Sequence, residues 1–197
     1  VKQLQVLPEL LRDNDYRVTA VYNNRDVLRF EPGDTTGSNY GVAVDIGTTT
    51  VVAYLIDLVK GERIGAASGL NTQRAYGQDV ISRINYTMTV EDGLGTLQKN
   101  IIEQINSLIT ALVEKHGIER DSVYSLVLAG NTTMIHLAAG LPAKNIALVP
   151  FISVNLNRMI IPVSQLGFDI CPEGVVYFVP GISGYVGADI VAGVLAS

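Results

Sequence analysis

The sequence predicts an α/β protein with a mixed sheet flanked by helices, preceded by a short α+β piece. Short β-rich runs alternate with helical patterns from residue 40 onward, an order typical of this class. Apolar residues make up 48% of the chain and charged residues 17%, as in ordinary soluble α/β proteins. A Gly/Ser/Thr-rich stretch separates the two parts at residues 32–39. We therefore expect residues 1–39 to be the tail of a preceding domain with its linker, and residues 40–197 to be a second unit.

The first part predicts one short helix and two strands. Apolar residues recur near its start at helical spacing, namely Leu4, Leu7, Leu10 and Leu11. Residues 16–22 and 26–31 then alternate as two strands around Asn23-Asn24, a dipeptide typical of a tight turn.

Three β-rich runs open the second part, at residues 41–46, 49–58 and 62–69. Gly-containing turns divide them, so they predict a meander of consecutive antiparallel strands.

Two helices follow. The first begins near residues 76–79, where Asp79 can face the amides of the first turn, and continues through Ile84. The second has apolar residues three and four apart over residues 94–112 and ends at Gly117. One face of this second helix is therefore predicted to pack on the sheet.

The remaining elements alternate between strand and helix. A buried-type strand at residues 123–129 precedes an apolar helix at 134–139, and a strand at 175–179 precedes a helix of small residues at 188–196. Residues 143–169 are expected to form an irregular insert. The predicted order is therefore three strands, two helices, a strand, a helix, the insert, a strand and a helix. This order matches a ribonuclease-H-like subdomain.

Charge and cysteine content exclude several kinds of partner. The net charge is −5 and no Lys/Arg cluster occurs, which argues against nucleic acid and against an anionic membrane surface. The longest apolar stretches are far below the ~20 residues that cross a bilayer. The single Cys171 supplies neither a disulfide framework nor a zinc or iron–sulfur site, so we expect an inert packing residue and a reducing cytoplasm.

The run from Asp45 to Thr50 is the strongest candidate for chemistry, because it connects two predicted strands. Gly47 allows backbone to approach a ligand, and the amides and hydroxyls of Thr48, Thr49 and Thr50 can donate to phosphate oxygens. Asp45 can hold hydrated Mg²⁺. The alternative is a hairpin turn whose Asp caps its own amides. Neither a Walker-type loop nor a G-x-G-x-x-G fingerprint is present in the sequence.

A second candidate comprises Gly130, Asn131 and Thr132. They follow the end of a strand and open a helix, where free amides favour an anion. The alternative is that Asn131 or Thr132 is simply the helix N-cap.

Four polar residues crowd between a strand and a helix, namely Asn71, Gln73, Tyr76 and Asp79. We expect a solvated loop with a helix start there. His136 is interpreted as a packing histidine and His116 as a favourable charge at a helix end.

Five motifs in order support a family resemblance. Residues 43–51 (AVDIGTTTV) resemble the first phosphate motif of the actin, sugar-kinase and heat-shock-chaperone (ASKHA) ATPase superfamily. Together with residues 71–84, 129–134, 150–151 and 180–189, they resemble the ATPase region of the reductive activators of corrinoid proteins, which are ASKHA domain-containing iron–sulfur proteins.

The resemblance implies a plan and a function. Residues 1–39 would end a middle domain, and residues 40–197 would form the first half of an actin-like ATPase lobe. The whole protein would use ATP and Mg²⁺ to return a Co(II) corrinoid protein to Co(I), with a [2Fe–2S] cluster only in an N-terminal domain absent here. This half alone is expected to be inactive, and a homodimer is possible.

Residue roles also follow from the resemblance. Asp45 would organise Mg²⁺ through water, and the loop from Gly47 to Thr50 would hold the nucleotide phosphates. Gly187 and Asp189 stand where the superfamily's first connecting helix brings a polar side chain near the metal-bound water, which makes Asp189 the catalytic candidate. The alternative is an Asp that only stabilises its helix.

Two other functions stay open. A small-molecule kinase of the same superfamily would need a general base, and Asp189 is the only candidate. A partner-binding module would present residues 71–84 or 143–169 to a corrinoid protein without using ATP.

Overall fold

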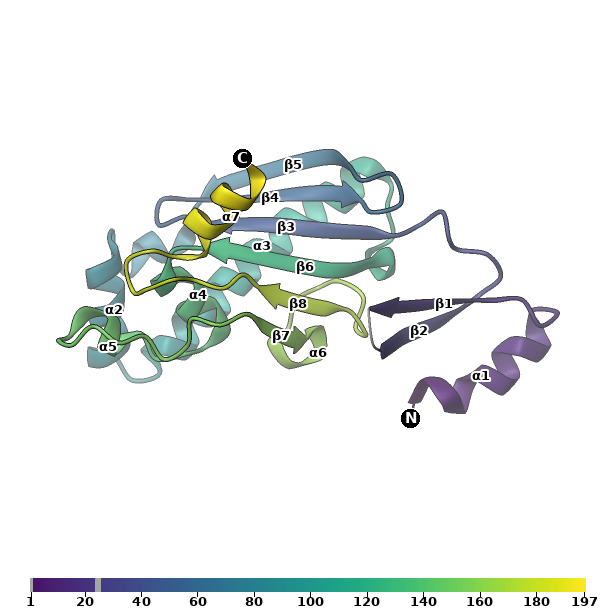
Figure 1. Ribbon diagram of the computed structural model, residues 1–197, viewed down its shortest axis with the longest axis horizontal. Helices are drawn as coiled ribbons and strands as arrows, with labels where there is room; N and C mark the ends of the chain where they lie inside the picture. Colours follow the sequence, from purple (N-terminus) through teal and green to yellow (C-terminus); the bar gives the residue numbers. More distant parts are fainter. Residues whose placement is uncertain (1, 24–25) are drawn as a thin grey trace.

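The computed structural model describes residues 2–23 and 26–197, and its described part holds a six-stranded and a two-stranded sheet (Figure 1). The strands of the larger sheet are β3 (Tyr40–Ile46), β4 (Thr50–Asp57), β5 (Glu62–Leu70), β6 (Val123–Gly130), β7 (Met159–Pro162) and β8 (Val175–Phe178). Their order is β5-β4-β3-β6-β8-β7. The first three form an antiparallel meander, β6 is parallel to β3, and β8 is parallel to β6. This is the mixed, ribonuclease-H-like sheet that the sequence predicts.

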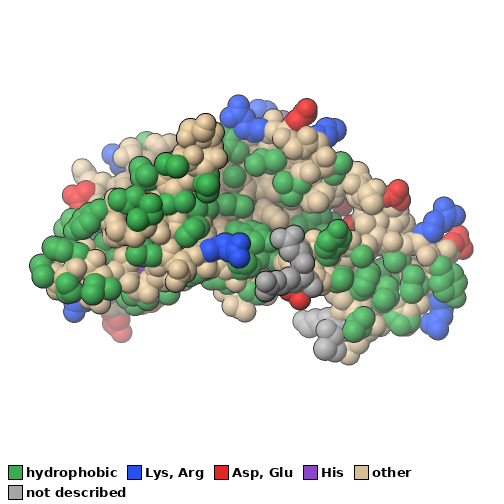
Figure 2. All heavy atoms as spheres, in the orientation of Figure 1, with side chains coloured by type: hydrophobic (Ala, Val, Ile, Leu, Met, Phe, Trp, Pro, Cys, Tyr) green, Lys and Arg blue, Asp and Glu red, His purple; other side chains and the backbone are tan. Residues whose placement is uncertain are grey.

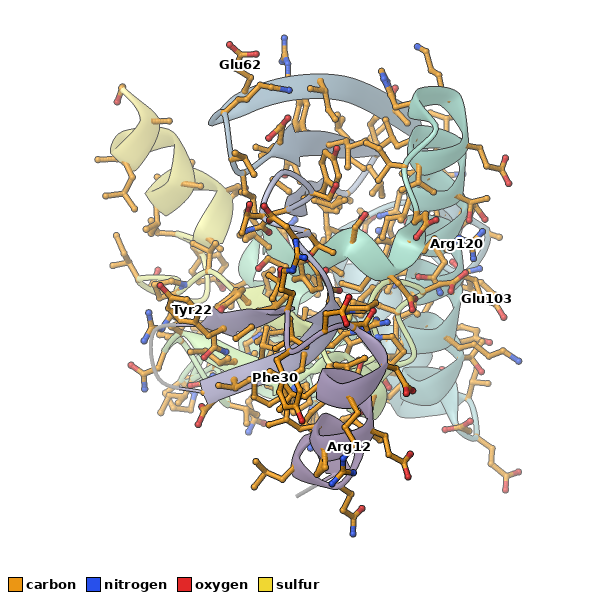
Figure 3. All side chains as sticks on the ribbon, turned by 90° about the vertical axis from the view of Figure 1, so that its right-hand side faces the viewer. Arg12, Tyr22, Phe30, Glu62, Glu103 and Arg120 are labelled. Carbon is orange, nitrogen blue, oxygen red and sulfur yellow. The ribbon has the colours of Figure 1, made fainter. Side chains whose placement is uncertain are left out.

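The helices lie on both faces of this sheet. They are α2 (Val80–Thr89), α3 (Gly93–His116), α4 (Thr132–Ala139), α5 (Lys144–Ala147), α6 (Val163–Leu166) and α7 (Ala188–Ala196), with short 3-10 turns at Thr72–Ala75 and Arg120–Ser122. Figure 3 shows α3 on one side of the sheet and α7 on the other. In the described residues no helix is long and apolar enough to cross a membrane.

The core forms between α3 and one face of the sheet. Alternate residues of the four central strands, β4, β3, β6 and β8, are buried in this core: Val42, Val44, Ile46, Val51, Ala53, Leu55, Leu126, Leu128, Val176 and Phe178. The periodic face of α3 meets them with Leu97, Ile101, Ile105, Ile109 and Leu112. Burying one such side chain contributes about 1.5–3 kcal/mol, so this layer fixes the positions of the strand ends.

The predicted irregular insert is partly regular. Residues 143–169 contain α5, α6 and the edge strand β7, which pairs antiparallel with β8. The prediction missed β7 because it has only four residues and ends in Pro162, which lacks the N–H that a longer ladder needs.

The N-terminal part forms α1 (Lys2–Asp13) and a hairpin of β1 (Val18–Asn23) and β2 (Asp26–Pro32). The turn predicted at Asn23-Asn24 lies partly outside the described residues. Figure 3 looks onto this end, with Tyr22 and Phe30 on the hairpin strands. The hydroxyl of Tyr124 on β6 donates to the carboxylate of Glu31 over 2.5 Å and ties the hairpin to the sheet.

A cavity of about 470 Å³ lies between this hairpin and β6. It is at the end of the sheet where β3 begins, opposite the end where β3 and β6 finish (Figure 1).

Candidate functional site at the carboxyl ends of β3 and β6

Two of the predicted motifs meet at the carboxyl ends of neighbouring parallel strands. Asp45 on β3 is in register with Ala129 on β6, and Ile46 is in register with Gly130. The loops that leave these strands, at Gly47 and at Asn131, therefore start side by side. Parallel strands produce this arrangement because both of their carboxyl ends lie at the same edge.

Gly47 permits the tight bend that follows β3. Its N–H donates to the carbonyl of Thr50 over 3.0 Å. A Cβ at position 47 would lie 2.5 Å from that carbonyl oxygen, so only glycine fits without a shift. Thr49, Thr50 and Asp45 are exposed, which leaves the bend open to a ligand.

The backbone carbonyls of residues 47–49 accept hydrogen bonds from the buried side of the bend. The side-chain amide of Asn71 donates to the Gly47 carbonyl over 2.8 Å, and its backbone N–H donates to the Thr49 carbonyl over 2.8 Å. The guanidinium of Arg83 donates to the Thr48 carbonyl over 2.6 Å. A trans peptide holds its N–H opposite its C=O. The N–H groups at residues 48–50 therefore point away from Asn71 and Arg83.

Asn131 links the second motif to the bend. Its side-chain oxygen accepts from the N–H of Met134 over 3.0 Å, so it is the N-cap of α4. Its side-chain nitrogen donates to the Thr48 hydroxyl over 3.0 Å. The N-cap alternative thus holds for Asn131, and the same side chain also lines the bend.

Thr132 and Gly130 hold neighbouring segments of the fold together. The Thr132 hydroxyl is buried and donates to the carbonyl of Ser183 over 2.7 Å, which commits it to the loop before α7. A Cβ at Gly130 would lie 2.7 Å from the carbonyl oxygen of Ile46. Gly130 therefore allows β3 and β6 to finish in close contact.

The start of α7 packs against the start of α4. A Cβ at Gly187 would lie 2.6 Å from the Cα of Asn131. Asp189 follows in the first turn of α7, where its carboxylate accepts from the N–H of Ile190 over 2.9 Å. Such a carboxylate is favoured by the helix dipole, as the alternative interpretation of Asp189 expects.

The negative charge of Asp189 reaches the carboxylate of Asp45. Partial burial raises the pKa of Asp45 above its usual range, and the negative charge of Asp189 adds a smaller rise. A divalent cation would relieve this repulsion. Within the described residues, His, Cys, Asp and Glu nowhere gather in threes in a metal-binding cluster. As a single exposed carboxylate, Asp45 is the kind of ligand that Mg²⁺ takes beside phosphate oxygens and water.

The solvated-loop prediction for residues 71–79 is wrong for two of its members. Asn71 and Gln73 are each 1% exposed, because they fill the space behind the bend. Gln73 donates to the carbonyl of Leu97 over 2.9 Å. The prediction holds for Asp79, which is exposed and caps α2 through the N–H of Ser82, and this bonding lowers the pKa of its carboxyl.

Sequence reasoning missed Arg83, which is 0% exposed. A signal was present, since Arg83 follows Val80 by three residues and precedes Ile84, on the apolar face of the predicted helix. A charged residue at a core position indicates a buried polar contact.

His136 and Cys171 are packing residues, as predicted. Because a carbonyl only accepts, Nδ1 of His136 donates to Thr132 over 2.7 Å, and burial lowers the pKa of the imidazole. Cys171 is buried and free, and burial raises the pKa of its thiol.

The fold and the converging loops define an α/β protein of ribonuclease-H-like topology, with a candidate anion site at the carboxyl edge of its sheet. A sequence profile of the family described as the RACo middle region matches residues 40–197. The chain belongs to this family.

Two relatives extend the comparison. The corrinoid activation enzyme RamQ of Eubacterium limosum is 35% identical over 177 residues, which cover 89% of this chain and 30% of that protein. A solved structure named reductive activator for corrinoid, iron–sulfur protein is similar with a TM-score of 0.92 and 39% identity, over 99% of this chain and 32% of that one. The chain spans about a third of the length of these relatives.

Proposed function

We propose that this chain supplies the nucleotide-phosphate side of an ATP-dependent reductive activator, which returns a protein-bound corrinoid from Co(II) to Co(I). The observation that carries the proposal is the bend after β3. Its N–H groups at residues 48–50 point away from the bonded carbonyls, beside the exposed carboxylate of Asp45. Both relatives bear names that refer to corrinoid activation or to a corrinoid protein.

Each residue has a defined task in this proposal. The N–H groups of Thr48, Thr49 and Thr50 hold phosphate oxygens, as fixed amides do in other anion sites. Asp45 orients the water shell of Mg²⁺, and Asp189 positions a water at the same edge. Gly47, Gly130 and Gly187 let the backbone segments come together. Asn131 fixes the start of α4 against the bend, and Thr132 fixes it against the loop before α7.

The reduction needs a driving force and an electron. ATP supplies the driving force, because the one-electron reduction of Co(II) corrinoid is uphill. A reduced [2Fe–2S] cluster, held by a part of the protein outside residues 1–197, would supply the electron for the cobalt. Nucleotide-driven closure of the two ATPase halves couples these events. The partner is a corrinoid protein in a reducing cytoplasm.

Reduction of a Co(II) corrinoid protein by the full-length protein tests this function. The assay contains a chemical reductant, with or without Mg·ATP, and follows the cobalt by visible absorbance. We expect the wild type to form Co(I) only with Mg·ATP. The Asp45→Ala variant should form little Co(I) even when Mg·ATP is present. Phosphorylation of a sugar or organic acid in place of cobalt reduction would support the kinase alternative. Capture of a corrinoid protein, unaffected by nucleotide and by Asp45→Ala, would support the binding module.

A further inference from the structure

Arg83 is a fully buried cation directly behind the bend. It belongs to the first turns of α2 and is 0% exposed. Its Nε donates to the Gly77 carbonyl over 2.9 Å and its Nη2 to the Thr48 carbonyl over 2.6 Å. Its Nη1 lies 3.1 Å from the sulfur of Met134 and 3.4 Å from the side-chain oxygen of Gln73.

These partners are all uncharged. Among residues 2–23 and 26–197, the ion pairs that form do not include Arg83. Burial, and then the positive charge of exposed Arg74, lowers the pKa of the guanidinium, and the negative charge of exposed Asp79 opposes this only in part. An unpaired buried charge is costly, and an apolar side chain of similar size would fill this space at lower cost. The position therefore calls for a reason other than packing.

The contact with Thr48 supplies that reason. The peptide that carries the Thr48 carbonyl also carries the N–H of Thr49, and the two groups point in opposite directions. A guanidinium that holds the carbonyl on the buried side therefore turns the Thr49 N–H to the open side. Asn71 does the same for the preceding peptide through the Gly47 carbonyl. Arg83 also adds a positive charge, which forms no ion pair among the described residues, one peptide away from that open side.

We propose that Arg83 is a positioning residue of the phosphate site: it orients the Thr48–Thr49 peptide toward the nucleotide and lends the site positive potential. This inference rests on the proposed function, since it presumes that the bend holds phosphate. It assigns Arg83 no contact with the nucleotide.

Nucleotide affinities of the full-length protein test the proposal. Arg83→Met removes the donors and the charge, Arg83→Lys keeps the charge and one donor group, and Arg74→Met is the matched control on the exposed side. We expect Arg83→Met to weaken Mg·ATP binding on the order of tenfold or more. The loss should shrink from ATP to ADP and vanish for adenosine, because only phosphates meet the bend. Arg83→Lys should recover part of the affinity, and Arg74→Met should bind like the wild type.

Two outcomes would overturn the proposal. One is an Arg83→Met protein that binds Mg·ATP within about twofold of the wild type. The other is an equal loss for ATP and adenosine, which would reduce Arg83 to a purely structural part of the fold. If Arg83→Met does not fold, the same comparison of ATP with adenosine is made on Arg83→Lys.

Failure of the proposed function is recognised separately. In that case the wild type binds no Mg·ATP. Hydrogen exchange of the amides at residues 48–50 then tests whether Arg83 positions the peptides of the bend. Faster exchange there in Arg83→Lys, with the rest of the sheet unchanged, supports the positioning role. Unchanged exchange contradicts it.

Discussion

The side-chain amide of Asn131 donates to the hydroxyl of Thr48 over 3.0 Å, across 83 residues of sequence. The same side chain caps α4 through Met134. One residue thus fixes the start of a helix and the side of the candidate phosphate bend. The first prediction separates these two tasks.

Asn131→Asp keeps the cap oxygen and loses the amide donor to Thr48. We expect it to retain the stability of α4, while Asn131→Ala loses the cap and about 1 kcal/mol of unfolding free energy. Both variants should bind Mg·ATP more weakly than the wild type, because both release the bend. Urea unfolding and calorimetric titration of the full-length protein measure the two effects. Loss of stability without loss of affinity in Asn131→Ala would assign Asn131 to the cap alone.

Gly187→Ala tests whether α7 must start in contact with α4. The added Cβ would lie 2.6 Å from the Cα of Asn131, so backbone has to move. We expect a loss of about 1–3 kcal/mol in unfolding free energy. The matched control is Gly193→Ala in the same helix, where a Cβ meets nothing within 4 Å. Alanine there should stabilise the helix by up to ~1 kcal/mol. Equal effects of the two substitutions would contradict the close contact at Gly187.

His136 makes the fold sensitive to acid. Burial lowers the pKa of its imidazole, so the unfolded chain binds the proton more tightly than the folded one. The stability that neutral His136 contributes is present above about pH 6.5 and is lost as the pH falls through the lowered pKa. His136→Asn should flatten the pH dependence of urea unfolding in this window. An unchanged pH dependence in His136→Asn would contradict this assignment.

Asp45 acts in the opposite direction. Its pKa is raised by partial desolvation and by the charge of Asp189, so the folded protein binds this proton more tightly than the unfolded chain does. Its contribution to stability is greatest at acid pH and declines as the pH rises from about 3.9 through the raised pKa. Without nucleotide, Asp45→Asn should therefore be at least as stable as the wild type at pH 7. A clear loss of stability in thermal unfolding would give Asp45 a structural role instead.

Much of the fold follows from local sequence patterns. The period of apolar residues in α3 and the β-rich runs of the meander match the structure, because each buries one face against the other. Gly117 and Gly140 end α3 and α4 in the left-handed conformation, as their positions predict. The edge strand β7 escaped prediction, since its pairing with β8 depends on tertiary contacts rather than on its four residues.

The candidate site was only partly visible in the sequence. The glycines, the threonine run and Asp45 carry local signals, because turns and phosphate loops restrict residue type. Asn71 and Gln73 carry no such signal, since each bonds to a partner 24 residues away. For Arg83 the only signal is a charged residue on the apolar face of a predicted helix, which does not reveal its partner Thr48. The polarity of Asn71 and Gln73 suggested a solvated loop, whereas both side chains donate to backbone carbonyls behind the bend.

Mg·ATP binding to full-length Asp45→Asn tests the central claim most directly. Calorimetric titration is carried out with the wild type and the variant, with and without Mg²⁺, at pH 7. If the bend after β3 holds a metal-bound phosphate tail, Mg²⁺ should strengthen ATP binding to the wild type and lose most of that effect in Asp45→Asn. Equal Mg²⁺ dependence in both proteins would contradict the account.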